Sequence, residues 1–401
     1  MKSVIILADG MADEPITFLD GKTPLQYART PYMDKLASLG VTGLLKTITD
    51  GFPPGSEVAN LSVLGYDIPT VYEGRGVLEA AGMGVELHPG EIALRCNLVC
   101  IKEKILSNFS AGHISDKEAF SLIKALNENL NSDLVHFYAG MSYRHLLILH
   151  EGNKQLICTP PHEILGKEYH RYLIKAATSE AKSTADFLNH LILKSQEILY
   201  KHPVNIKRMA EGKEAANSIW LWSPGKRPAM PTLKEMYGIE NGSVISAVDL
   251  IKGIGIYAGL RSIPVKGATG SYDTDYEGKA KAALEAIKHD EFVYLHIEAP
   301  DEAGHEKDVA LKIRTIEDID KHIVAPIYES LKRQEEPVAI AILPDHPTPC
   351  ATGLHSSSPV PFLIYKPGVK PDKVCSFDEK SVKEGRFGLL EGAQFIKKVL
   401  E

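Results

Sequence analysis

Five short runs of Val, Ile and Leu, without polar alternation, restrict what this chain can fold into. Strands with one face in water alternate apolar and polar side chains, whereas strands covered on both faces of a parallel sheet do not. The runs are VIILA from Val4, VISAV from Val244, FVYLHI from Phe292, VAIAIL from Val338 and PFLIY from Pro361. Helical patterns lie between them, including residues 23–40 and 309–334. Strands alternating with helices predict an α/β fold with a mostly parallel sheet flanked by helices.

The middle of the chain has a different pattern. From about Tyr66 to Glu180, strand-like segments surround one helical segment, residues 116–130. This predicts a smaller α+β domain inserted into the α/β domain. The amphipathic stretch 181–202 is interpreted as the return to the main sheet. At 401 residues, two domains are expected in any case. We expect a discontinuous main domain of residues 1–66 and 185–401, with an inserted domain of residues 67–184.

Composition excludes several classes of function. The net charge of −7 argues against a general nucleic-acid binder, because nothing would balance a phosphate backbone. The five cysteines include no CxxC pair, which favours reduced thiols over a disulfide framework or a thiolate zinc site. The apolar run near the first residue is too short for a signal peptide or a membrane span. These features predict a cytoplasmic protein with no membrane partner.

Acidic side chains follow three of the predicted strands. Asp9 follows the first run, Asp301 follows the third, and Asp345 with His346 follows the fourth. Ligands collect at the carboxyl ends of strands in an open parallel sheet, so we expect these groups to converge. His305 and His355 follow in the adjoining loops. Carboxylate and imidazole ligands suit Mn²⁺ or Zn²⁺, and six such groups fit two neighbouring ions better than one. The alternative is that they are unrelated polar residues at strand ends.

Ser56 offers a group that such a centre could use. In FPPGSEVANLSVLGYD, the glycine and prolines predict a tight turn, and Ser56 opens a short helix. A serine at this position is commonly a plain N-cap. The same position also presents free N–H groups and the positive end of the helix dipole, which suit a phosphate. A metal-bound serine oxygen loses its proton readily and becomes a nucleophile.

Several longer segments resemble one family. They are ADGMADEP, TPLQYARTPYMDKLASLG, PPGSEVANLSVLGYD, GRGVLEAAGMGVEL, GATGSYDTDYEGKA, HIEAPDEAGH and LPDHPTPC with HSSSPVPFLIY. In these segments the chain is similar to the archaeal-type, cofactor-independent phosphoglycerate mutases of the alkaline phosphatase superfamily. The similarity extends from the first strand to beyond residue 365. It implies an alkaline-phosphatase-like fold and a mutase that interconverts 3-phosphoglycerate and 2-phosphoglycerate through a phosphoserine, in glycolysis or gluconeogenesis.

The resemblance also implies roles for individual residues. One divalent ion would be held by Asp9, Ser56, Asp345 and His346, and a second by Asp301, His305 and His355. The ions would be Mn²⁺ first, with Mg²⁺ or Zn²⁺ as alternatives, and no organic cofactor would be needed. Ser56 would be the phosphorylated nucleophile. The candidate substrate-binding residues are Arg75, Arg95, Arg144, Arg227 and Lys252, since arginine matches both carboxylate and phosphate. The inserted domain would bind the substrate and close over the site as a lid, excluding water.

Two other functions remain open at this point. Some bacterial members of this branch are labelled proposed homoserine kinases, so homoserine kinase or another metal-dependent phosphotransferase or phosphomonoesterase is the alternative. His113 stands where members of the family have arginine, and this difference leaves the identity of the substrate open. Against the kinase, the sequence contains no GxxxxGK[ST] loop for ATP. The third possibility, a catalytically silent metal-binding scaffold, would not require the nucleophile and ligand set that the chain carries.

Overall fold

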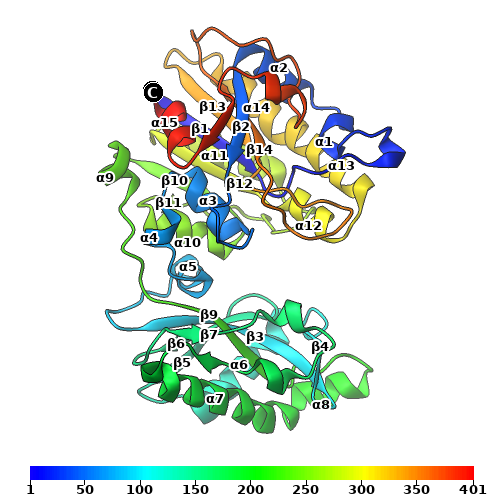
Figure 1. Ribbon diagram of the computed structural model, residues 1–401, viewed down its shortest axis with the longest axis vertical. Coiled ribbons are helices and arrows are strands. Elements are labelled where there is room, and N and C mark those ends of the chain that lie inside the picture. Colours follow the sequence, from blue (N-terminus) through cyan, green and yellow to red (C-terminus); the bar gives the residue numbers. More distant parts are fainter. The chain divides into compact units, whose positions relative to one another are not determined.

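A computed structural model describes residues 1–401 (Figure 1). The chain forms two compact units, Met1–Tyr72 with Ala229–Glu401, and Glu73–Pro228. The inserted unit ends at Pro228, whereas the sequence pattern predicts an end at residue 184. The reason lies in β9 (Ser218–Gly225), which pairs with β3 (Ile92–Lys102) inside the inserted unit. The helix α7 (Lys182–Tyr200) packs on β9, so the stretch interpreted as a return to the main sheet belongs to the insert.

The first unit is built on an eight-stranded sheet in the order β11-β10-β12-β1-β13-β14-β2-β15. Its strands are β1 (Lys2–Ala8), β2 (Val41–Lys46), β10 (Gly242–Ile245), β11 (Arg261–Ser262), β12 (Phe292–Ile297), β13 (Val338–Leu343), β14 (Val360–Tyr365) and β15 (Leu389–Glu391). Pairing is parallel from β11 through β13, whereas β14 runs antiparallel to both β13 and β2. The expected α/β class with a mostly parallel sheet is confirmed.

Helices cover both faces of this sheet, as the strand composition predicts. Val4 and Ile6 of β1 lie in one core with α2, α11, α13 and α14. On the other face, Gly255 of α10 lies against Val244, and Phe395 of α15 packs against Phe362 with ring centroids 5.2 Å apart. The helices are α1 (Pro24–Tyr27), α2 (Pro31–Leu39), α3 (Ser56–Val63), α4 (Ile68–Val71), α9 (Leu233–Tyr237), α10 (Asp249–Tyr257), α11 (Tyr276–Ala286), α12 (Ala299–His305), α13 (Val309–Ile319), α14 (Ala325–Leu331) and α15 (Gln394–Leu400), with 3-10 turns η1 (Thr17–Leu19) and η6 (Ser381–Glu384).

Two expected helices are interrupted. Residues 23–40 form α1 and α2 rather than one helix, because Pro31 has no backbone N–H to continue α1 and instead starts α2. Residues 309–334 form α13 and α14 joined by a π-helical turn, η5 (Asp320–Val324). The turn directs the buried Asp320 carboxylate at the first turn of α2, where it accepts hydrogen bonds from Tyr32 N and Met33 N.

The inserted unit has its own sheet and core. Four of its strands lie in the order β4-β3-β6-β5, and β9 pairs with β3 to complete a five-stranded sheet. Side chains from one face of β3 and β6 pack against α6 and α7. The bounds are β4 (Ile105–Asn108), β5 (Val135–Tyr138), β6 (Arg144–Leu149), a separate pair β7 (Leu156–Ile157) and β8 (Lys175–Ala176), helices α5 (Arg75–Gly82), α6 (Asp116–Leu130) and α8 (Pro203–Ala210), and 3-10 turns η2 (Pro161–Ile164), η3 (Tyr169–Tyr172) and η4 (Ser179–Ala181). The predicted α+β character and the helix over 116–130 agree with this arrangement.

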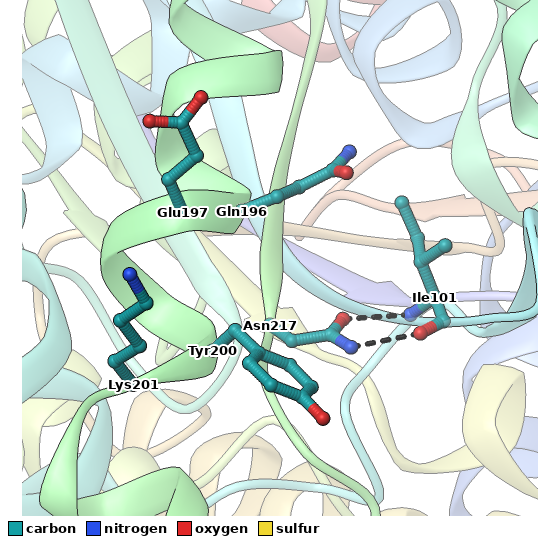
Figure 2. Close-up of a pocket in the computed structure, with 6 residues that line it drawn as sticks. All are labelled: Ile101, Gln196, Glu197, Tyr200, Lys201 and Asn217. Carbon is teal, nitrogen blue, oxygen red and sulfur yellow. Dashed lines mark hydrogen bonds between the residues drawn. The ribbon is translucent and has the colours of Figure 1, made fainter.

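Asparagine side chains complete backbone hydrogen bonding in this unit. Asn217, just before β9, accepts from Ile101 N at 2.8 Å and donates to Ile101 O at 2.7 Å (Figure 2). The amide thereby replaces a strand partner for Ile101 at a point where the β3–β9 ladder has ended. The same two residues line a pocket of about 510 Å³ with Gln196, Glu197, Tyr200 and Lys201.

None of the helices combines the length and the apolar character needed to cross a lipid bilayer. All five cysteines are free thiols.

Candidate metal centre

Three neighbouring strands end at one cluster of polar side chains. The central strand β1 pairs with both β12 and β13, and Asp9, Asp301 and Asp345 follow these strands. Asp9, Asp345 and His346 are fully buried. The Nε2 atom of His346 lies 3.5 Å from Asp9 Oδ1 and 3.5 Å from Asp345 Oδ2. Carboxylates far apart in the sequence thus converge on one imidazole.

Gly10 allows the strand ends to approach this closely. Its φ of +61° lies in the left-handed region, and a Cβ there would lie 2.5 Å from Asp301 Oδ1. Its backbone N–H donates to Asp345 Oδ1 at 3.1 Å. Position 10 therefore requires glycine for both its backbone conformation and the space beside Asp301.

Ser56 lies in the same cluster. It is the first residue of α3, and its Oγ is 3.2 Å from His346 Nε2 and 3.4 Å from Asp9 Oδ2. The apolar Val58 and Leu61 of α3 are buried, which fixes the helix and its first residue. The N-cap of α3 is Gly55, so Ser56 is the first helical residue and not the N-cap. Its hydroxyl faces the carboxylates and the imidazole.

A second group of ligating atoms surrounds Asp301. His305 Nε2 lies 3.1 Å from Asp301 Oδ2, and His355 Nε2 lies 3.4 Å from Asp301 Oδ1. The two Nε2 atoms are 3.0 Å apart. The rings of His355 and His346 have centroids 4.0 Å apart, so this group adjoins the first. The seven residues expected to hold metal therefore lie together at the carboxyl ends of the central strands.

The hydrogen bonds of the histidines show which ring nitrogen faces Asp301. His305 Nδ1 lies 2.9 Å from the Gly353 carbonyl and His355 Nδ1 lies 3.4 Å from the Pro54 carbonyl. A carbonyl can only accept, so each Nδ1 carries a hydrogen, and Nε2 is the nitrogen that each ring turns towards Asp301. Buried Asp9 Oδ1 has no hydrogen-bond partner. This set of imidazole nitrogens and carboxylate oxygens fits divalent ions such as Mn²⁺ or Zn²⁺.

The electrostatics of the cluster favour positive charge. Burial disfavours a charged His305, but the Asp301 carboxylate outweighs burial and raises the pKa of His305 to about 9. For Asp9, burial and the neighbouring Asp345 carboxylate raise the pKa well above its usual range. Several buried carboxylates so close together require a compensating cation, whether protons or metal ions.

Two residues beside Asp9 were not predicted from the sequence. His296 Nε2 lies 3.0 Å from Asp9 Oδ2, and Glu298 Oε2 lies 3.8 Å from the same nitrogen. Burial lowers the pKa of His296 to about 3, so the neutral ring donates to Asp9 through Nε2 and accepts from Ser246 Oγ at Nδ1. Burial, with the Asp301 carboxylate, raises the pKa of Glu298 to about 8. Their position at the end of the same strand as Asp301 was the available signal.

Asn60 was also missed. It lies one helical turn after Ser56, and its Nδ2 donates to Ser56 O at 2.8 Å and to Asp345 Oδ2 at 2.9 Å. Its Oδ1 accepts from the Tyr294 hydroxyl at 2.7 Å. All of these side chains except that of Ser56 are buried. Asn60 therefore ties the first turn of α3 to an expected metal ligand.

Three of the expected substrate-binding residues cluster in the inserted unit. Arg75 Nε and Arg95 Nε lie 2.8 and 3.0 Å from the two carboxylate oxygens of Glu79. Burial would raise the pKa of Glu79, but Arg95 and Arg75 outweigh burial and lower it, with a smaller contribution from Arg144. Burial lowers the pKa of Arg95 to about 10, and its guanidinium stacks 4.6 Å from the Trp222 ring. Three guanidinium groups around one carboxylate leave an excess of positive charge.

The other two expected substrate-binding residues lie outside this cluster. Arg227 is 59% exposed and its guanidinium is 3.9 Å from Glu86. Lys252, in the first unit, pairs with Asp249 one turn earlier in α10 at 3.0 Å. The pocket in Figure 2 contains none of the residues expected at the site.

Comparison with known proteins agrees with the resemblance noted in the sequence. Residues 37–205 match the family model described as 2,3-bisphosphoglycerate-independent phosphoglycerate mutase. The chain is 49% identical to the protein of that name from Methanosarcina mazei, over 99% of this chain and 98% of the relative. A solved Pyrococcus horikoshii protein is 32% identical, with a TM-score of 0.84 over 100% of this chain and 96% of that one.

The solved cofactor-independent phosphoglycerate mutase from Thermoplasma acidophilum is 26% identical to this chain. It has a TM-score of 0.66 and covers 100% of this chain and 99% of its own. Both the sequence and the fold thus extend over the full length of the relatives. The chain belongs to the 2,3-bisphosphoglycerate-independent phosphoglycerate mutase family.

Proposed function

We propose that this protein is a metal-dependent phosphoglycerate mutase that interconverts 3-phosphoglycerate and 2-phosphoglycerate through a phosphoserine at Ser56. The observation that carries the proposal is the place of the Ser56 hydroxyl, 3.2 Å from His346 Nε2 and 3.4 Å from Asp9 Oδ2 at the start of α3. The relatives of that name are similar over their full length.

Seven residues would hold two divalent ions in this proposal, with Mn²⁺ as the first choice. Asp9, Ser56, Asp345 and His346 form one ligand set, and Asp301, His305 and His355 form the other. When bound, such ions polarise phosphoryl oxygens and favour the deprotonated serine oxygen. The Nε2 atoms of His305 and His355, which face Asp301, and the absence of a hydrogen-bond partner for Asp9 Oδ1 support this assignment.

The reaction then needs two displacements at phosphorus. Ser56 Oγ attacks the phosphorus of 3-phosphoglycerate, the bond to the C3 oxygen breaks, and that oxygen takes up a proton. The C2 hydroxyl of the retained glycerate next loses a proton and attacks the phosphoserine, which releases Ser56. Direct transfer between adjacent hydroxyls lacks the in-line geometry that phosphoryl transfer prefers. Two in-line steps give retention of configuration at phosphorus.

The substrate carries a carboxylate as well as a phosphate. The cluster of Arg75, Arg95 and Arg144 supports a role in binding these anionic groups, because arginine binds both in a bidentate manner. One carboxylate, Glu79, orients two of the guanidinium groups. In this proposal the inserted unit binds the substrate, and water must be kept from the phosphoserine, since hydrolysis would otherwise compete with transfer back to glycerate.

The substitution Ser56→Ala tests the proposal. Mutase activity of the Mn²⁺-loaded protein with 3-phosphoglycerate should fall to background, because no other residue provides the covalent step. Metal binding should weaken but remain detectable, since Asp9, Asp345 and His346 still supply ligands. Asn241→Leu, at an exposed residue, is the control with unchanged activity. Near wild-type turnover of Ser56→Ala would show that the nucleophile lies elsewhere.

A parallel assay separates the alternative function. Wild-type protein with homoserine and ATP, under the same metal conditions, should form no phosphohomoserine. ATP-dependent product, with no conversion of 3-phosphoglycerate, would replace the mutase by a phosphotransferase at the same Ser56 centre.

A further inference from the structure

Thr348 contacts both proposed ligand sets. It lies two residues after His346 in the loop between β13 and β14, and it is fully buried. Its hydroxyl oxygen is 2.5 Å from Asp301 Oδ1 and 3.3 Å from His346 Nδ1. Asp301 belongs to one ligand set and His346 to the other. A single hydroxyl therefore connects them.

The direction of these hydrogen bonds follows from their partners. An ionised carboxylate only accepts, so the Thr348 hydroxyl donates its hydrogen to Asp301. The Thr348 oxygen is then free to accept, and its partner His346 must carry a hydrogen on Nδ1. A neutral imidazole has one N–H, so the lone pair of His346 is on Nε2. That nitrogen faces Asp9, Ser56 and Asp345.

We propose that Thr348 is a positioning residue that fixes the tautomer of His346 and couples the two ligand sets through Asp301. The proposal rests on the metal ligands assigned under the proposed function. His305 and His355 obtain the same tautomer from backbone carbonyls. His346 alone among the three obtains it from a side chain that also bonds to the neighbouring set.

The backbone holds Thr348 in place. Its N–H donates to Ala12 O at 3.2 Å, and its carbonyl accepts from the buried Lys312 Nζ at 2.8 Å. Lys312 also pairs with buried Asp13 at 2.8 Å. Gly304 of α12 leaves room for this loop, because a Cβ there would lie 2.5 Å from Thr348 O. With its backbone fixed and its β-branched side chain restricted at χ1, the hydroxyl has little freedom to move.

Metal affinity tests the proposal with matched variants. Thr348→Val keeps the shape and removes the hydroxyl, whereas Thr348→Ser keeps the hydroxyl. Titrating metal-free protein with Mn²⁺ in a calorimeter, we expect Thr348→Val to lose about 10- to 100-fold in affinity, as other outer-shell partners do. The loss should extend to both ions, and Thr348→Ser should restore wild-type affinity. Thr42→Val, which removes a buried hydroxyl bonded to Asp372, is the control.

A purely structural role would give a different pattern. If Thr348 contributed only packing, Thr348→Val, which fills the same space, would have an Mn²⁺ affinity closer to wild type than Thr348→Ser. Wild-type Mn²⁺ affinity in a folded Thr348→Val protein would overturn the proposal. A loss of affinity for only one of the two ions would overturn the coupling between the ligand sets.

The tautomer of His346 can also be measured directly in the wild-type protein by NMR. In metal-free protein labelled with ¹⁵N-histidine, His346 should show a protonated Nδ1 and an unprotonated Nε2, with the resonance assigned by its absence in His346→Asn. A protonated Nε2 would overturn the Thr348 inference. Failure of the proposed function would appear differently, as wild-type protein that binds Mn²⁺ but does not convert 3-phosphoglycerate.

Discussion

Asn60 uses every polar atom of its side chain to join three elements. Replacing it with alanine would leave the Tyr294 hydroxyl, the Ser56 carbonyl and one oxygen of Asp345 without their present partner. A buried polar group left unpaired costs about 1–3 kcal/mol. We expect Asn60→Ala to lower kcat at least about tenfold, because Ser56 loses its fixed position. KM should change little, since the arginines proposed to bind the substrate are untouched.

Steady-state kinetics with 3-phosphoglycerate would measure this split. Tyr294→Phe removes only one of the bonds and should give a smaller fall in kcat. A rise in KM at unchanged kcat in Asn60→Ala would contradict the positioning role.

His145 makes the inserted unit sensitive to pH. It is buried, its Nδ1 accepts from Gly140 N at 3.0 Å, and burial lowers its pKa from 6.5 to about 3. The unfolded chain binds a proton below pH 6.5 and the folded chain does not, so stability is lost as pH falls from 6.5 towards 3. Between pH 7.5 and 5.5 this one group should reduce the free energy of unfolding by about 1.4 kcal/mol.

Denaturant titration followed by tryptophan fluorescence would measure the effect, because Trp220 and Trp222, the two tryptophans of the chain, both lie on β9. The His145→Asn side chain offers Oδ1 in place of Nδ1 and does not titrate. The variant should therefore lose less stability than the wild type between pH 7.5 and 5.5. His190→Asn, at an exposed histidine, should retain the wild-type pH dependence. Equal losses in wild type and His145→Asn would rule out the assignment.

At the scale of single residues, sequence patterns identify side chains that follow a strand or open a helix. Asp9, Asp301, Asp345 and Ser56 were predictable for that reason. Asn60 and Thr348 were not, because their roles depend on contacts with residues 285 and 47 positions away, respectively. Their immediate neighbours carry no sign of those contacts.

Among the elements, the strands of the main sheet were the most predictable, because burial on both faces leaves a continuous apolar run. The end of the inserted unit was placed wrongly because an amphipathic helix such as α7 can cover either of two sheets, and its sequence does not say which. The π-helical turn at Asp320–Val324 has a similar cause. In this turn Asp320 accepts hydrogen bonds from Tyr32 N and Met33 N, and the local sequence carries no sign of these partners nearly 290 residues away.

Asparagine clamps stabilise the elements of the inserted unit, and Asn205 is the most buried of them. Its Oδ1 accepts from Ala216 N at 2.8 Å, and its Nδ2 donates to Leu199 O and Ala216 O at 2.8 and 2.9 Å. Asn205→Leu would leave the N–H and the carbonyl of Ala216 without this partner, whereas Leu199 O would keep its bond from His202 N. We expect a loss of at least about 2 kcal/mol in the free energy of unfolding, measured by tryptophan fluorescence.

Asn129→Leu is the control, since Asn129 is exposed and bonds only within its own helix. It should change stability by less than about 0.5 kcal/mol. An equally small change in the free energy of unfolding for Asn205→Leu would show that the hydrogen bonds of Asn205 do not stabilise the unit.

In the molecule as a whole, the proposed metal ligands and the tryptophans lie in different units. All seven expected metal ligands belong to Met1–Tyr72 and Ala229–Glu401. A ligand at about 100 times its Kd stabilises the folded state that binds it by about 2.7 kcal/mol. We expect Mn²⁺ to raise the calorimetric Tm of the first unit, and EDTA to reverse the shift.

The unfolding transition seen by tryptophan fluorescence should stay where it is when Mn²⁺ is added. The two units have separate cores, which is the physical basis of this expectation. An equal shift in both signals would instead show that the two units unfold as one.

The position of β1 in the centre of its sheet has a consequence for biosynthesis. Its two neighbours, β12 and β13, leave the ribosome only after about 280 further residues have been made. At about 5–20 residues per second, this wait is roughly 15 to 60 s. During that time an apolar strand has no native partner on either edge, and exposed segments of this kind tend to aggregate. The nascent chain should therefore depend on chaperones from its first few dozen residues, long before any residue of the second proposed ligand set has been synthesised.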